Sequence, residues 1–133
     1  MNRWIYLLLF TIIFSNVYTQ EKWRGNTTPT YRELINHLKK ISSLHSEVEL
    51  YNMGSSDYGL PIYLCIVNGA KDSINTFKKA REETTILFNN AIHPGEPDGI
   101  NACLIWLEEL LNNKKSIKNL PVVAFIPAYN IGG

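Results

Sequence analysis

The segment that decides the fold is residues 84–112, which read TTILFNNAIHPGEPDGINACLIWLEELLN. Its first part, Thr84 to Ile92, is apolar enough to predict a strand. A loop follows at His93–Glu96, and Pro97 predicts the start of a helix that ends near Asn113, because proline fits the first helical position. The helix should face the core with one apolar stripe and point Glu108 and Asn112 away from it. The stripe comprises Ile100, Cys103, Leu104, Leu107 and Leu111.

A further apolar strand, Val122–Ile126, follows that helix. Strand, helix and strand in this order predict a βαβ unit, with two parallel strands in a helix-covered sheet. Upstream, Val48–Met53 and Leu60–Val67 flank a turn-rich stretch and predict an antiparallel hairpin. We therefore expect an α/β fold, with a mixed β-sheet and helices on both faces. Because the strands at 60–67, 86–92 and 122–126 carry apolar residues on both faces, each should be buried on both.

Two helices are predicted outside the βαβ unit. Thr30 and Glu33 have the spacing of a capping box, which predicts the start of a helix of about fourteen residues. Its apolar face carries Leu34, Leu38 and Ile41, and His45 continues that face as a partly buried structural residue. A second, short helix is expected around Thr76–Ala80.

The first nineteen residues have the pattern of a secretory signal peptide. A basic start at Arg3 is followed by the apolar run Trp4–Phe14 and a polar stretch with small residues. The run is shorter than the roughly 20 residues that span a bilayer, so we expect cleavage and no stable membrane span afterwards. An uncleaved anchor is the alternative. The predicted organisation is a signal peptide at 1–19, a lead-in at 20–29 and one domain at 30–133, secreted or periplasmic.

Composition argues against a nucleic-acid-binding protein and favours one globular domain. The 133 residues carry 13 Lys+Arg against 12 Asp+Glu, a net charge of +1 that is too small for the basic patch that nucleic-acid binding requires. Hydrophobic residues make up 45% of the chain, enough for the core of one domain. Cys65 and Cys103 lie inside apolar runs, which favours two buried thiols. Because export permits disulfides, a bridge between them is the alternative.

The chemistry-bearing residues lie in the loop between the strand and its helix. His93 and Glu96 are separated by Pro94 and Gly95, a pair that favours a tight turn. A tight turn can direct an imidazole nitrogen and a carboxylate to one point, and both are zinc ligands. On spacing alone there is a second interpretation. In it, Glu96 caps the following helix, whose positive end favours a carboxylate, and His93 is an ordinary loop residue.

The stretch His93–Gly99, placed between a strand and an amphipathic helix, resembles the first zinc-ligand motif of the M14 zinc metallocarboxypeptidase family. Two further segments resemble motifs of the same family, Gly54–Ile62 in the hairpin and Pro127–Asn130 after the last strand. The resemblance implies the zinc carboxypeptidase fold, with Zn2+ bound by His93 and Glu96. It also implies hydrolysis of C-terminal peptide bonds, with peptide or protein C-termini as substrates.

The chain also departs from the family pattern. Gly95 stands where digestive carboxypeptidases have a substrate-binding arginine, and Ile131-Gly132-Gly133 stands in place of Pro-Asp-Gly. The resemblance places the third zinc ligand, the catalytic glutamate and the carboxylate-binding pair beyond Asn130. We therefore expect a fold that is incomplete at its C-terminus and inactive alone, with no catalytic residue assigned in this chain.

Two other functions are compatible with the same loop. One is a zinc deacylase of the succinylglutamate desuccinylase and aspartoacylase type, which shares the fold and the His-x-x-Glu pair. The other is a non-catalytic binding domain that kept the loop. Pro94, Pro97 and the export signal favour the peptidase.

Overall fold

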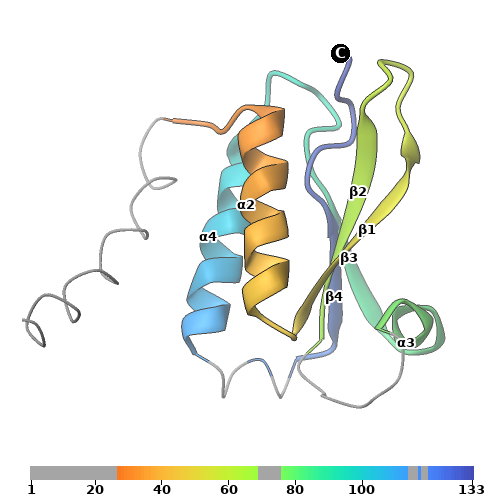
Figure 1. Ribbon diagram of the computed structural model, residues 1–133, viewed down its shortest axis with the longest axis vertical. Coiled ribbons are helices and arrows are strands. Elements are labelled where there is room, and N and C mark those ends of the chain that lie inside the picture. The colour runs from red at the N-terminus through yellow and green to blue at the C-terminus, as the bar shows by residue number, and fades with distance from the viewer. Residues whose placement is uncertain (1–26, 69–75, 114–116, 118–119) are drawn as a thin grey trace, which may run out of the picture.

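The computed structural model describes residues 27–68, 76–113, 117 and 120–133. The predicted signal peptide and most of the lead-in lie outside these residues. The elements, in chain order, are α2 (Tyr31–Leu44), β1 (Val48–Ser55), β2 (Pro61–Val67), α3 (Thr76–Glu82), β3 (Thr85–Asn89), α4 (Asp98–Asn112) and β4 (Val122–Ile126) (Figure 1). Among the described residues, every helix is too short or too polar to cross a bilayer.

The four strands form one mixed sheet in the order β1-β2-β4-β3. β1 and β2 form the predicted antiparallel hairpin, and β2 pairs antiparallel with β4. β3 and β4 run parallel, and α4 connects them. The expected α/β class, the hairpin and the βαβ unit are therefore confirmed.

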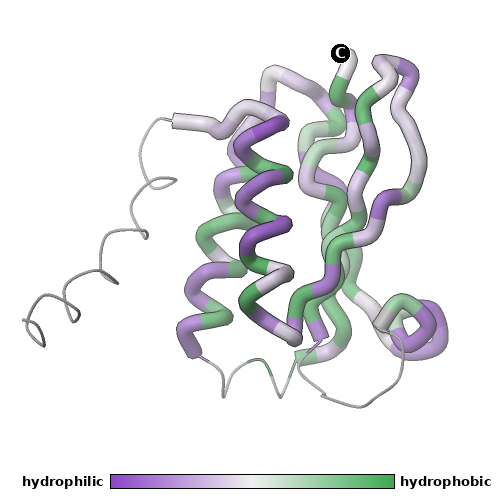
Figure 2. The backbone as a smooth tube through the Cα atoms, viewed as in Figure 1, coloured by the Kyte–Doolittle hydropathy of each residue, from purple (hydrophilic) through white to green (hydrophobic). Residues whose placement is uncertain are grey.

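Helices lie on both faces of the sheet. α2 and α4 stand side by side on one face, and α3 lies on the other (Figure 1). Figure 2 shows hydrophobic and hydrophilic segments alternating along α2, as expected of a helix with one buried face. The larger core fills the space between α2, α4 and the sheet. Its buried members include Leu34, Leu38, Ile41, Val48, Cys65, Val67, Leu104, Leu107, Leu111 and Phe125.

The predicted capping box starts α2. The Glu33 amide donates to Thr30 Oγ1 at 3.3 Å, and the Thr30 amide donates to Glu33 Oε2 at 3.0 Å. Such a cap stabilises a helix by about 1 kcal/mol, which helps α2 to begin at Tyr31. The Tyr31 hydroxyl also donates to the Pro61 carbonyl and thereby fastens the helix to β2.

The predicted orientation of Glu108 on α4 is wrong. Glu108 does not point into solvent, because its Oε1 lies 2.9 Å from His37 Nε2 on α2, with both side chains largely buried. The apolar residues spaced along α4 identified the face of the helix that packs on the sheet. They did not identify the flank of α4 that meets α2.

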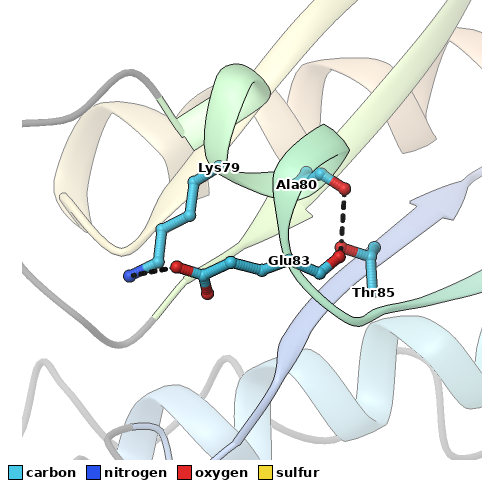
Figure 3. Close-up of polar contacts among 4 residues, drawn as sticks. All are labelled: Lys79, Ala80, Glu83 and Thr85. Atoms are coloured by element: carbon cyan, nitrogen blue, oxygen red, sulfur yellow. Dashed lines mark hydrogen bonds and ion pairs between the residues drawn. The ribbon is translucent and has the colours of Figure 1, made fainter.

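The polar contacts at the end of α3 fix the start of β3 (Figure 3). Thr85 Oγ1 donates to the Ala80 carbonyl at 2.8 Å, and the Glu83 amide donates to the Lys79 carbonyl at 2.9 Å. Lys79 Nζ lies 3.8 Å from Glu83 Oε1. These bonds satisfy carbonyls at the helix end, so α3 passes into β3 within two residues.

The predicted burial of β3 on both faces is wrong. β3 is one of the two edge strands of the described sheet, and Ile86, Leu87 and Phe88 remain 45%, 59% and 45% exposed. β2 is buried only in its second half, and β4 is buried over most of its length. Beside α3, the sheet bears an open apolar groove of about 380 Å³, lined by residues that include Met53, Ile62, Leu64, Leu87 and Ile126. The strand sequence matches a buried environment that the described residues do not provide.

Both cysteines are free thiols, as the composition favoured. Cys65 is buried in β2, whereas Cys103 on α4 is only half-buried, less than predicted. Desolvation raises the pKa of both thiols, and the neighbouring Cys103 raises that of Cys65 further. Both side chains should therefore be poor nucleophiles in the folded protein.

The exposed β3 edge predicts self-association, because an apolar strand with an open edge templates pairing with another chain. Leu87→Lys should reduce association measured by sedimentation velocity. Leu44→Lys is the matched control, since Leu44 is at least as exposed as Leu87 but lies at the end of α2, away from β3. A wild-type chain that stays monomeric at high concentration would contradict this prediction.

The buried thiol predicts a loss of stability in alkali. Burial raises the pKa of Cys65 in the folded state above its pKa in the unfolded chain. The stability that the buried thiol contributes is therefore complete below the unfolded-state pKa and declines as pH rises above that pKa. The free energy of unfolding should therefore fall above about pH 8.5, by at most about 1.4 kcal/mol per pH unit from this one group. Denaturant unfolding between neutral and alkaline pH measures the slope, and Cys65→Ala should flatten it. An unchanged slope in that variant would show that other groups cause the loss.

Candidate metal centre

Three loops meet at one end of the sheet, beyond the carboxyl ends of β3 and β4 (Figure 1). Because β3 and β4 are parallel, the loop after β3 and the loop after β4 leave from the same end. The Tyr129 amide donates to the Asn90 carbonyl at 3.0 Å, and the Asn130 amide donates to the Ala91 carbonyl at 3.0 Å. The turn of the β1–β2 hairpin joins them, since a Cβ atom on Gly132 would lie 2.8 Å from the Tyr58 Cβ atom.

His93 and Glu96 occupy the first and last positions of a tight turn in the loop after β3. The Glu96 amide donates to the His93 carbonyl at 3.1 Å, which closes the turn. Pro94 stands at the second position, where its fixed φ angle suits a turn. His93 Nδ1 lies 3.2 Å from Glu96 Oε2, and the two side chains are 74% and 73% exposed.

This arrangement fits two neighbouring corners of a zinc site. Zinc bonds to histidine nitrogen and carboxylate oxygen at about 2.0–2.2 Å, so tetrahedral ligand atoms are about 3.4 Å apart. The 3.2 Å between Nδ1 and Oε2 is close to that separation. The two residues can therefore share one metal ion after small side-chain movements.

The alternative interpretation, in which Glu96 caps α4, finds no support in the contacts. Residue 97 is the N-cap of α4, and the helix start has no side-chain cap hydrogen bond. The amides of Ile100 and Asn101 instead donate to the Pro97 carbonyl, at 2.9 and 3.1 Å. The Glu96 carboxylate is directed at His93.

The backbone before the turn is tightly held. Ala91 has φ = 51°, in the left-handed region that residues other than glycine rarely adopt. The Asn90 amide donates to the Ile126 carbonyl at 3.1 Å, and Asn130 Nδ2 donates to the Ile92 carbonyl at 3.3 Å. Strain of this kind persists only where neighbouring contacts fix the backbone, and it commonly occurs at functional sites. It also explains why β3 ends at Asn89 and not at Ile92.

The remaining histidines do not join the pair. His37 contacts Glu108 between α2 and α4, and His45 ends α2 as its C-cap, consistent with the structural role expected of it. Within the described ranges, no group of three or more His, Cys, Asp or Glu residues is placed to hold a metal ion. Asn90 was not among the predicted site residues. The available signal was a pair of asparagines, Asn89 and Asn90, inside an otherwise apolar strand pattern.

Comparison with protein families identifies the domain. The family model described as zinc carboxypeptidase matches residues 34–131. A search of curated protein sequences gave no match.

Solved structures show the same fold. A structure of bovine thrombin-activatable fibrinolysis inhibitor, in complex with tick carboxypeptidase inhibitor, matches 79% of this chain and 32% of its own, with a TM-score of 0.63 and 16% identity. A crystal structure of thrombin-activatable fibrinolysis inhibitor matches 85% of this chain and 27% of its own, with a TM-score of 0.69 and 14% identity. The chain therefore spans about a third of the length of these structures.

The left-handed Ala91 predicts a sharp dependence on side-chain shape. Ala91→Val should lower the free energy of unfolding by more than about 1 kcal/mol, because a β-branched residue is disfavoured at positive φ. Ala91→Gly should be nearly neutral, since glycine adopts this conformation readily. Urea denaturation measures both. A tolerated valine together with a destabilising glycine would show that the backbone here is not left-handed.

Proposed function

This chain belongs to the zinc carboxypeptidase family M14, and from that membership we propose that His93 and Glu96 are its first two zinc ligands. The site they belong to would hydrolyse the C-terminal peptide bonds of peptides or proteins. The observation that carries the proposal is the 3.2 Å separation of His93 Nδ1 and Glu96 Oε2. The turn that bears them follows directly on residues whose carbonyls are hydrogen-bonded to the β4 loop.

The residues of the loop have distinct roles in this proposal. Zinc bound here would act as a Lewis acid, which would polarise the scissile carbonyl and lower the pKa of a bound water. His93 would bind the metal through the lone pair of a neutral imidazole nitrogen. Glu96 contributes an anionic oxygen that offsets part of the charge of the metal. The high exposure of both side chains leaves them open to substrate and solvent.

We propose that these 133 residues alone do not hydrolyse peptides. A catalytic zinc site takes three protein ligands plus water, and the described residues bring two together. At Gly95 a Cβ atom would have no heavy atom within 4 Å, so the structure has open space where digestive relatives carry a substrate-binding arginine. Substrate preference would therefore be set by residues outside this loop.

Export of the protein and the choice among its possible functions are also proposals. Removal of residues 1–19 and a secreted or periplasmic location rest on the N-terminal sequence pattern. The family match supports the peptidase over the zinc deacylase and over a non-catalytic binding domain.

Zinc titration of single-residue variants tests the ligand assignment. By calorimetry, the chain should bind zinc weakly, and His93→Ala or Glu96→Ala should each weaken binding more than about tenfold. The reason is that even residues behind the ligands are worth about 10–100-fold in metal affinity. His45→Ala is the matched control, because it removes an imidazole at the end of α2 and should change nothing.

Two results would contradict these proposals. Tight stoichiometric zinc binding that survives Glu96→Ala would show that the ligands lie elsewhere. Release of C-terminal residues from a test peptide by this chain would show that it is complete as a catalyst.

A further inference from the structure

Asn90 is a buried polar residue between the last residue of β3 and the left-handed Ala91. The residue is 8% exposed, and buried amides are nearly always paired. Asn90 Nδ2 donates to Cys103 Sγ on α4 at 3.1 Å. Its backbone amide and carbonyl bond to the Ile126 carbonyl and the Tyr129 amide. One residue thus ties together β4, the loop after β4 and α4.

The fit of Asn90 against α4 is close. A Cβ atom added to Gly99 would lie 2.9 Å from Asn90 Oδ1 and 3.5 Å from Asn90 Cγ, and all three nearest atoms belong to Asn90. The asparagine side chain therefore fills the space beside Gly99 in the first turn of α4. Its carboxamide packs against one face of α4, where Gly99 and Cys103 are neighbours one turn apart.

These contacts lie three residues before His93. The carbonyls of Ala91 and Ile92 are bonded to Asn130, and the Pro97 carbonyl begins the hydrogen bonds of α4. The loop is consequently fixed from Asn90 to Ile92 and again from Pro97. Between these two fixed points lies the turn that carries His93 and Glu96.

We propose that Asn90 is the positioning residue of the His93–Glu96 pair, because its buried side chain sets the orientation in which the loop presents both ligands to one metal ion. This inference rests on the proposed zinc role of those two residues and extends it to a side chain that touches neither of them. The Asn90–Cys103 bond is weak, since thiol sulfur is a poor acceptor. Its loss should therefore act on the loop more than on the stability of the whole domain.

Two variants disturb this contact from opposite sides. Asn90→Ala removes the side chain, and Gly99→Ala keeps Asn90 but displaces it, while placing a better helix former in α4. Asn89→Ala is the matched control, because Asn89 is the adjacent asparagine and is exposed at the end of β3. All are made in the full chain, and each is first checked for cooperative unfolding.

Two measurements are made on each variant. Amide hydrogen exchange of Glu96, Tyr129 and Asn130 reports the loop directly, because these amides close the turn and join it to the β4 loop. Calorimetry with zinc alone reports the ligands. In Asn90→Ala and Gly99→Ala the three amides should exchange about tenfold faster and zinc should bind about 10–100-fold more weakly, as for other residues that orient ligands. Asn89→Ala should match the wild type in both.

The outcomes separate this inference from the proposed function. Unchanged amide exchange in both variants overturns the positioning role, and so does faster exchange with unchanged zinc affinity. A wild-type chain without measurable zinc binding overturns the proposed function, while faster amide exchange would still support Asn90 as the residue that orders the loop. If Asn90→Ala fails to unfold cooperatively, Gly99→Ala, which retains the asparagine, decides the question.

Discussion

The parallel pairing of β3 with β4 is the constraint on which the candidate site depends. The register sets Phe88 opposite Phe125 and Asn89 opposite Ile126, so the two strands end at the same level of the sheet. Only then can the loop after β4 donate amides to the carbonyls of Asn90 and Ala91. A shift of one residue in this register would separate those partners and leave the turn at His93–Glu96 without its support.

Features encoded by nearby residues were predictable from the sequence. The Thr30–Glu33 capping box, the hairpin and the βαβ order each depend on residues within one or two elements, and the structure has all three. The burial of β3 was not predictable. Apolar composition shows that a strand suits a buried environment, but the neighbours that would bury it are not encoded in the strand itself.

The same distinction applies to the candidate site. The approach of His93 to Glu96 spans three residues and follows from Pro94 and Gly95, so sequence reasoning could propose it. The contact of Asn90 with Cys103 spans thirteen residues. That contact depends on how α4 lies against the sheet, and no local pattern specifies it. The pairing of Glu108 with His37, across two helices, was missed for the same reason.

The strand order has a consequence for how the domain assembles during synthesis. β4 is the last described strand to leave the ribosome, yet it lies between β2 and β3. Its pairing of Phe125 with Cys65 joins residues far apart in the chain, so a large loop must close before the sheet becomes continuous. Until Val122–Ile126 has been made, the hairpin and β3 have no common neighbour. The nascent chain therefore exposes a two-stranded hairpin and an unpaired β3 strand, and this is the stage at which chaperones would be most useful to it.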